Sequence, residues 1–252
     1  MDWNHPQSFN QKLQWMKIHD RDPRYTELVD KFKAKEIVGS MLGYDHIIPT
    51  IGVYDSFIEI DFNTLPKSFV LKCTHDSGCT LVCKDKESFD IQNARVRLTN
   101  AINTDYYKYW REWPYKDVPR KIIAEEYKDD GSGELKDYKI FCFDGEPYMI
   151  QVDYGRFSEH KRNLYDLNWQ YIPVRFTYPN DSSVKIQRPA ELKEMLNMAR
   201  SLSKNEKFIR IDFYICGGTV YFGEFTLFPE GGYGSFDNKQ FEKDISNRFK
   251  IF

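Results

Sequence analysis

The sequence lacks the features of a secreted, membrane-spanning or disulfide-stapled protein. No stretch of its 252 residues approaches the ~18 uncharged apolar residues that a spanning helix needs. The first residues, 1–6, lack the basic and apolar regions of a signal peptide. The five cysteines are scattered and contain no C-x-x-C pair, so we expect reduced thiols and a cytoplasmic protein.

An excess of one charge is also lacking. Lys and Arg number 36 and Asp and Glu number 38, which gives a formal net charge of -2. No global positive field therefore attracts nucleic acid or an anionic membrane, and we expect neither as a partner. Any affinity for phosphate must come from a local site. The oligomeric state cannot be deduced from these numbers.

A zinc pattern is missing as well. Cys79 and Cys83 lie near His75 in the sequence, but their spacing does not match the common zinc motifs. No second pair of ligands follows them. The sequence therefore predicts no zinc site at these three residues.

The chain does contain material for a large core, because 41% of its residues are hydrophobic and 16% are aromatic. A length near 250 residues fits one large domain or two packed lobes, at about 150 residues per domain. Apolar periodicity predicts helices over residues 25–42, 88–110, 189–203 and 236–249. Strands are predicted over residues 68–73, 80–83, 120–127, 137–143, 146–152, 208–215 and 220–228, with residues 155–183 irregular. This order indicates an α+β fold in two lobes.

The strand over residues 208–215 is the most informative segment. Period-two alternation places Ile209, Ile211 and Phe213 on one face and Arg210 and Asp212 on the other. The returning strand carries Glu224 and Thr226 on a single face.

Loop length decides whether Asp212 and Glu224 share a face, since a slip of one residue reverses every side chain. A two-residue turn at residues 217–218 separates them, whereas a three-residue loop over 216–218 makes them diagonal neighbours. We predict the three-residue loop, because otherwise Glu224 points into the apolar layer. Carboxylates gathered in this way would bind a Mg²⁺ ion that carries the phosphates of a nucleotide, and an ordinary solvated ion pair is the alternative.

Three other segments suit a nucleotide. Lys72 ends a buried strand just before the small-residue turn 75–78, whose backbone N–H groups could hold phosphate oxygens. Residues 125–127 fit either an adenine-binding hinge or a strand that enters an acidic loop. Asp137 and Lys139 alternate onto one strand face, where they could meet ribose and phosphate.

In order along the chain, these segments resemble the ATP-grasp superfamily and its TupA-like branch, named for teichuronopeptide biosynthesis. The matching segments are residues 15–17, 21–25, 30–31, 65–72, 75–78, 120–127 and 137–145. The most specific block is Arg210-Ile211-Asp212-Phe213-Tyr214 followed by Tyr221-Phe222-Gly223-Glu224-Phe225-Thr226-Leu227-Phe228-Pro229. Several motifs in the right order are more specific than any one of them.

The resemblance implies a role for each matching residue. ATP would be bound by Lys31, Lys72, the lid residues His75, Ser77 and Gly78, the hinge residues Glu125, Glu126 and Tyr127, and the ribose-side acid Asp137. Asp212 and Glu224 would bind Mg²⁺, with Thr226 where many ATP-grasp enzymes have asparagine, which leaves a second Mg²⁺ position undecided. Lys139 and Arg210 would act in catalysis.

The resemblance also implies an architecture and a reaction. We expect a nucleotide between two antiparallel-sheet lobes, with an N-terminal segment over 1–43, an N-terminal lobe over 44–124 and a C-terminal lobe over 125–252. The α/β domain that usually leads such ligases is expected to be absent or reduced. The implied activity is ATP-dependent amide formation between a carboxylate, such as a sugar acid of a surface polysaccharide, and an amine.

Other functions stay open from the residues alone. A glycosyltransferase that uses a nucleotide sugar is the main alternative, and a phosphotransferase or a non-catalytic nucleotide-binding protein are two more. Arg156 and Arg162, in the irregular segment, could bind an acidic substrate.

Overall fold

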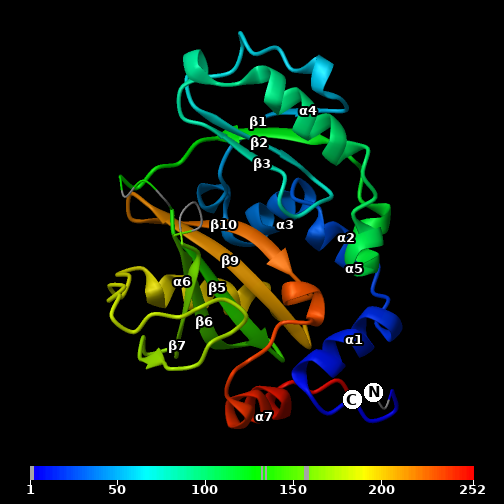
Figure 1. Ribbon diagram of the computed structural model, residues 1–252, viewed down its shortest axis with the longest axis vertical. Helices are drawn as coiled ribbons and strands as arrows, with labels where there is room; N and C mark the ends of the chain where they lie inside the picture. Colours follow the sequence, from blue (N-terminus) through cyan, green and yellow to red (C-terminus); the bar gives the residue numbers. More distant parts are fainter. Residues whose placement is uncertain (1–2, 132, 134, 156–158) are drawn as a thin grey trace. The chain divides into compact units, whose positions relative to one another are not determined.

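The computed structural model describes residues 3–131, 133, 135–155 and 159–252, in two units (Figure 1). Unit 1 contains Met1–Arg21 and Asp129–Phe252, and unit 2 contains Asp22–Lys128. The chain thus leaves unit 1 after its first helix and returns to it at residue 129. The expected ranges 1–43, 44–124 and 125–252 do not join the first residues to the C-terminal part in this way. Arg156 lies outside the described residues. Within those residues, no helix has the length and apolar character needed to cross a bilayer.

Unit 2 is built on a four-stranded antiparallel sheet with strand order β1-β4-β2-β3. Its strands are β1 (Thr50–Tyr54), β2 (Phe69–Cys73), β3 (Thr80–Cys83) and β4 (Ile122–Glu126). The β2–β3 hairpin confirms the one predicted from the sequence. Phe69 and Leu71 point to one face, where Leu98 of α4 (Ile91–Ile102) completes an apolar core. The opposite face carries Lys72 and Glu125 because β-strand side chains alternate.

The helix predicted over residues 25–42 is interrupted. The structure has α2 (Arg24–Val29) and α3 (Lys33–Leu42), with a break at Asp30. The Asp30 carboxylate accepts hydrogen bonds from the backbone N–H groups of Phe32 (2.8 Å) and Lys33 (3.3 Å), and so starts a new helix. The break leaves the Lys31 backbone N–H free to donate to the Thr74 carbonyl oxygen at 3.1 Å.

The single helix predicted over residues 88–110 is also wrong, because α4 ends at Ile102 and α5 (Tyr107–Trp110) follows a turn. The short 3-10 helices of unit 2 are η1 (Tyr44–His46), η2 (Phe57–Glu59), η3 (Lys86–Ser88) and η4 (Trp113–Asp117).

Unit 1 is built on a six-stranded antiparallel sheet with strand order β10-β9-β5-β6-β7-β8. Its strands are β5 (Asp137–Phe143), β6 (Glu146–Tyr154), β7 (Lys161–Tyr165), β8 (Tyr171–Ile172), β9 (Phe208–Cys216) and β10 (Thr219–Thr226). β7 and β8 lie in the segment that was expected to be irregular, so that expectation is wrong for them. Two antiparallel sheets with flanking helices confirm the predicted α+β class.

The two faces of the unit 1 sheet differ sharply. On one face, fully buried residues such as Ile140, Val152 and Ile211 lie under α6 (Leu192–Leu202), which packs on β5, β6 and β9. We call the other face the charged face. It carries Asp137, Lys139, Asp153, Arg162, Arg210, Asp212, Glu224 and Thr226.

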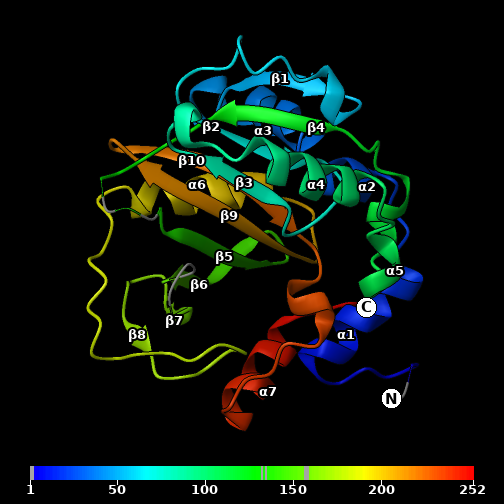
Figure 2. The same ribbon diagram turned by 45° about the horizontal axis from the view of Figure 1, so that its top comes forward.

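One end of the charged face is sealed by the first and last helices, α1 (Phe9–His19) and α7 (Lys239–Arg248), which lie side by side (Figures 1 and 2). The Phe9 ring lies 5.2 Å from the Phe208 ring and 5.9 Å from the Phe249 ring, centroid to centroid. The Phe9 backbone N–H donates to Ser246 Oγ at 2.8 Å. Aromatic packing thus joins two helices from opposite ends of the sequence.

The β9–β10 connection corrects the predicted loop. Thr219 faces Cys216, so the turn is the two-residue Gly217–Gly218, with φ of 58° and 77°. Such a turn alone sets Gly223 opposite Asp212. A β-bulge at Gly223 shifts the register, however, and brings Glu224 directly opposite Asp212. The shared face is confirmed, but the bulge produces it rather than a longer loop.

We predict that Gly223→Ala destabilises the protein by about 1–3 kcal/mol through overpacking. A Cβ at this position lies 2.9 Å from Tyr214 Cε2 and 3.1 Å from the backbone oxygen of Asp212, so the bulge must deform. Urea unfolding measures the change, with Thr219→Ala on the same strand as the control. Equal stability of Gly223→Ala and the parent protein would contradict this account.

Candidate functional site

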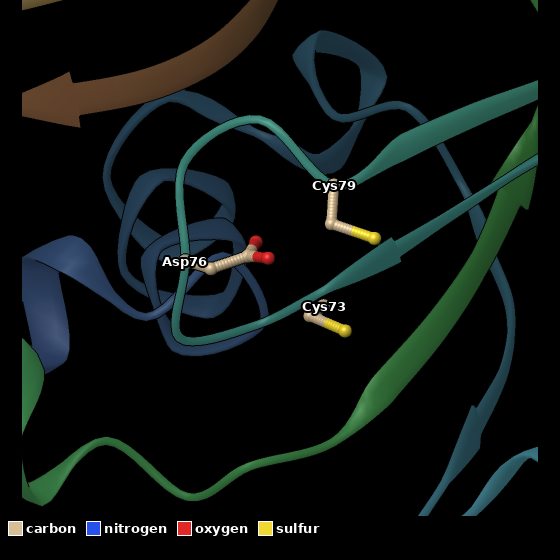
Figure 3. A group of neighbouring side chains, drawn as sticks. All are labelled: Cys73, Asp76 and Cys79. Carbon is tan, nitrogen blue, oxygen red and sulfur yellow. The ribbon is translucent and has the colours of Figure 1, made fainter. Parts of the chain in front are cut away.

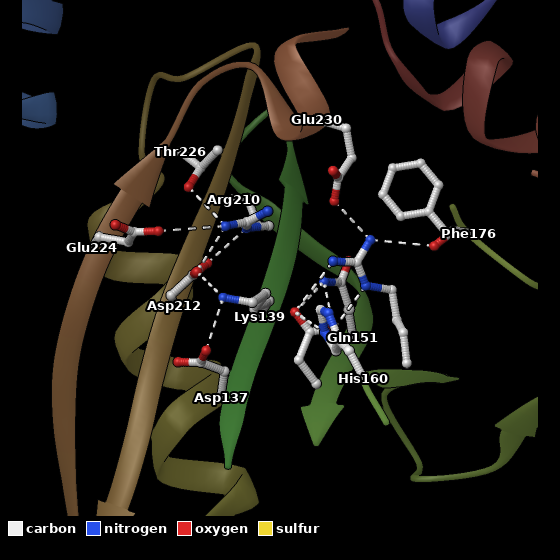
Figure 4. Close-up of polar contacts among 12 residues, drawn as sticks. Asp137, Lys139, Gln151, His160, Phe176, Arg210, Asp212, Glu224, Thr226 and Glu230 are labelled. Carbon is white, nitrogen blue, oxygen red and sulfur yellow. Dashed lines mark hydrogen bonds and ion pairs between the residues drawn. The ribbon is translucent and has the colours of Figure 1, made fainter. Parts of the chain in front are cut away.

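The predicted metal-binding residues meet around Arg210 on the charged face (Figure 4). The Arg210 guanidinium holds both Asp212 carboxylate oxygens, with Nε–Oδ1 2.7 Å and Nη2–Oδ2 2.8 Å. Its Nη2 also donates to Thr226 Oγ1 at 2.9 Å and lies 3.6 Å from Glu224 Oε1. One arginine therefore contacts all three residues for which metal binding was predicted.

Lys139 supplies a second cation to this group. Its ammonium pairs with the Asp212 carboxylate and lies 3.3 Å from Asp137 Oδ2. Asp212 is 1% exposed and Lys139 3% exposed, so each charge needs the other. Burial raises the pKa of Asp212, but the charges of Arg210 and Lys139 outweigh burial and leave that pKa below its usual value. Glu224 is more accessible, with 36% of its side chain exposed.

The donor set fits Mg²⁺. Asp212 and Glu224 offer carboxylate oxygens and Thr226 offers a hydroxyl oxygen, the hard ligands that this ion prefers. Asp137, Asp212 and Glu224 carry three negative charges against two positive charges on Lys139 and Arg210. The remaining negative charge favours a cation beside the accessible Glu224 carboxylate.

A second buried ion pair on the charged face was not predicted. Asp153 on β6 faces Arg162 on β7, and Arg162 Nε donates to Asp153 Oδ1 at 2.7 Å. Arg162 Nη1 also donates to Glu230 Oε1 at 2.8 Å, and Gln151 Nε2 to Asp153 Oδ1 at 3.1 Å. Burial raises the pKa of Asp153, yet His160 and Arg162 together hold it well below its usual range. Two polar residues at alternate positions of an apolar strand, 151 and 153, were the available signal.

In unit 2, Glu125 lies between two lysines. Lys72 Nζ is 2.6 Å from Glu125 Oε2, and Lys35 of α3 pairs with the other carboxylate oxygen. Lys35 also donates to the Ile48 carbonyl oxygen at 2.6 Å and to Thr50 Oγ1 at 3.0 Å. Burial raises the pKa of Glu125, but the charges of Lys72 and Lys35 outweigh it and bring that pKa below its usual value. The carboxylate predicted to meet adenine thus holds two lysines in place, and its contact with adenine stays a prediction.

Lys35 was missed by the sequence analysis. It lies four residues after Lys31, in the first turn of α3, and a charged residue type gives no local sign that its side chain is buried. Burial lowers the pKa of Lys35 to about 8, although Glu125 opposes that shift.

Lys31 joins the turn that was predicted to cover phosphate. Its ammonium donates to the Asp76 carbonyl oxygen and lies 3.6 Å from Asp76 Oδ1. Ser77 and Gly78 are exposed at the tip, where Gly78 has φ 113°. His75 is buried instead, with Nε2 3.3 Å from the Thr104 carbonyl oxygen, and burial lowers its pKa.

The other two predicted hinge residues, Glu126 and Tyr127, do not share the contacts of Glu125 with Lys72 and Lys35. Glu126 is exposed, its carboxylate pairs with Lys128 at 2.9 Å, and its backbone N–H donates to the Pro49 carbonyl oxygen at 3.0 Å. Tyr127 is half-buried after the end of β4. The structure therefore groups Lys72 with Glu125, Lys31 with the 75–78 turn, and Asp137, Lys139, Arg210, Asp212, Glu224 and Thr226 on the charged face.

A two-sheet α+β chain with these residue groups has the make-up of an ATP-grasp protein. The family model described as TupA-like ATPgrasp matches residues 11–250. The chain therefore belongs to the TupA-like ATP-grasp family, and the resemblance found in its motifs is confirmed. A search of curated protein sequences found no match.

Several solved structures are similar to this chain. D-alanine–D-alanine ligase from Bacillus anthracis is 18% identical with a TM-score of 0.44, over 79% of this chain and 57% of that one. D-alanine–D-alanine ligase from Helicobacter pylori is 12% identical with a TM-score of 0.49, over 96% of this chain and 69% of that one. Phosphoribosylamine–glycine ligase from Thermotoga maritima is 12% identical with a TM-score of 0.48, over 83% of this chain and 51% of that one. The chain spans 57% of the first of these enzymes.

The low pKa of Lys35 predicts a specific pH dependence of stability. Between about 8 and the unfolded value of 10.5, the unfolded chain holds a proton that the folded chain has lost. The free energy of unfolding should therefore gain up to about 3 kcal/mol from this group as the pH rises through that window. Urea unfolding from pH 7 to 10 should show this rise in the parent protein and lose it in Lys35→Met. Parallel pH profiles of the two proteins would refute the assignment.

Proposed function

We propose that this protein is an ATP-dependent carboxylate–amine ligase that uses Mg²⁺ and forms an amide through an acyl phosphate. The observation that carries the proposal is the grouping of Asp212, Glu224 and Thr226 around Arg210 in a chain of the TupA-like ATP-grasp family. A carboxylate does not react with an amine until its oxygen becomes a leaving group. Phosphorylation by ATP supplies that leaving group.

The reaction has two balanced steps. A carboxylate oxygen of the substrate attacks the γ-phosphorus of ATP, the bond from that phosphorus to the bridging oxygen breaks, and ADP leaves. The amine then attacks the acyl carbon, phosphate departs with its oxygen, and the amine nitrogen loses a proton. Mg²⁺ held by Asp212, Glu224 and Thr226 would neutralise charge on the phosphates.

Arg210 and Lys139 prepare the charged face for negative charge. Both side chains are buried and already oriented by Asp212, so little reorganisation is needed when the phosphoryl group transfers. Lys139 would contact the transferring phosphoryl group. Arg210 would hold the reacting carboxylate and the oxyanion that forms when the amine attacks.

The residues of unit 2 would bind the nucleotide. Lys72, oriented by Glu125, and Lys31, joined to the 75–78 turn, supply two cations for phosphate oxygens. The exposed residues Ser77 and Gly78 suit a lid that excludes water from the acyl phosphate. Glu126 and Tyr127 would border adenine. Asp137, which belongs to unit 1, would meet the ribose.

The substrates are proposed from the family resemblance. The carboxylate would be a sugar acid or a glycan-bound uronate, and the amine an amino acid or a small amine, in bacterial surface-polysaccharide synthesis in the cytoplasm. A screen of uronic acids against amines with ATP, read by mass spectrometry, tests this. An amide with one ADP formed per bond supports it, and UDP or GDP release from a nucleotide sugar would indicate a glycosyltransferase instead.

We predict that Glu224→Gln lowers kcat/KM for ADP formation by at least about 100-fold, as expected when a group that stabilises the transition state is lost. The partly exposed Glu224 can change without unfolding the protein. Asp212→Asn should be as inactive but also less stable, because Arg210 and Lys139 lose a buried partner. Glu146→Gln, an exposed carboxylate paired with Arg200 in the same unit, is the control. Normal turnover in Glu224→Gln would reject the metal assignment.

We predict that Lys72→Ala weakens ATP binding by about tenfold or more, the loss typical of a hydrogen bond between charged groups. Lys35 still pairs with Glu125 in this variant, so the fold should persist. Isothermal titration calorimetry measures the affinity. Lys121→Ala removes a more exposed lysine of unit 2, paired with Asp55, and should bind ATP normally. Equal affinity in the parent protein and Lys72→Ala would remove Lys72 from the phosphate site.

A further inference from the structure

The tip of the β2–β3 hairpin brings together two thiols and a carboxylate that the proposed ligase chemistry does not use. Lys72 faces Thr80 across the hairpin, and the next pair outward in the same register is Cys73 and Cys79. Asp76 lies in the turn between them (Figure 3). Both sulfur atoms and an Asp76 carboxylate oxygen all lie within 4.8 Å of one another.

This separation is close to that of metal ligands. Zinc–sulfur bonds of about 2.3 Å and zinc–oxygen bonds of about 2.1 Å place tetrahedral ligand atoms roughly 3.5–3.8 Å apart. Small side-chain rotations therefore suffice to close the three ligands on one ion. A pair of thiolates also selects a soft cation over Mg²⁺, which prefers oxygen.

The surrounding charge suits a dication. Two thiolates and the Asp76 carboxylate carry three negative charges, and a divalent ion with the Lys31 ammonium carries three positive charges. Lys31 lies 3.6 Å from Asp76 Oδ1 and donates to the Asp76 carbonyl oxygen. It can therefore orient the carboxylate from outside the coordination shell, as partners of metal ligands commonly do.

The three residues differ in how far they are buried. Cys73 is fully buried and Asp76 is 8% exposed, whereas Cys79 is half-buried. Cys73 lies in the apolar core of unit 2, and the partly exposed Cys79 would leave room for solvent as a fourth ligand. Cys83, which the sequence places beside Cys79, instead faces Phe69 at the other end of β3.

We propose that Cys73, Asp76 and Cys79 bind one thiophilic divalent cation of the Zn²⁺ class, with a water molecule as the fourth ligand. Both thiols release their protons to solvent on binding, so the charge balances. The ion would tie the end of β2, the turn and the start of β3 together. Its ligands belong to unit 2, whereas the oxygen ligands Asp212 and Glu224 belong to unit 1.

The test uses the full chain, reduced and stripped of metal, with excess Mg²⁺ to occupy oxygen sites. Equilibrium dialysis against Zn²⁺ should give one ion per chain, and Cd²⁺ should produce the ultraviolet charge-transfer band of cadmium thiolates. Cys79→Ser should weaken Zn²⁺ binding by more than about 100-fold and Asp76→Asn by about 10–100-fold. Cys83→Ser, which changes another cysteine of the same hairpin, should bind Zn²⁺ normally. Circular dichroism verifies that each variant is folded.

Several results would overturn the proposal. One is the absence of Zn²⁺ uptake by a chain whose thiols are shown to be reduced. Another is full Zn²⁺ uptake by Cys79→Ser, and a third is a loss of Zn²⁺ affinity in Cys83→Ser as large as that in Cys79→Ser. Formation of a Cys73–Cys79 disulfide in air, with no uptake after reduction, would also reject it. Zn²⁺ binding and ATP-dependent ADP formation are measured separately, so failure of one leaves the other intact.

Discussion

The buried Asp212 carboxylate and its two cations form the interaction on which the charged face depends. A carboxylate that is 1% exposed is costly without compensation, and Arg210 and Lys139 supply it from β9 and β5. Those two cations in turn attract Glu224 and Asp137. Charges of opposite sign therefore alternate across three strands, and each one holds its neighbours in place. The side chains are oriented before any ligand binds.

The sequence predicted the two faces of the β9 strand correctly because period-two alternation is a local property. It also predicted that Asp212 and Glu224 lie together, but it assigned this to the wrong cause. The two glycines form a tight turn, and the bulge at Gly223 then restores the shared face. An isolated glycine within a strand pattern was the only local sign of that bulge.

Other features depend on contacts between residues far apart in the sequence. The Asp153–Arg162–Glu230 group and the pairing of Lys35 with Glu125 require knowledge of which strands and helices become neighbours. Helix periodicity likewise did not reveal the break at Asp30, because the Asp30 side chain replaces backbone hydrogen bonds without disturbing the apolar pattern. Burial and pairing of charge, rather than residue type, were the unpredictable part of the site.

The division of unit 1 between residues 1–21 and 129–252 has a consequence for biosynthesis. On a translating ribosome, the continuous segment 22–128 emerges complete and can fold first. Helix α1 emerges earlier but must wait for α7 and Phe249, the last partners of Phe9 to be synthesised. Its apolar side stays uncovered during that interval. Helix α1 therefore gains the aromatic partners of Phe9 only after residues 208 and 249 have been made.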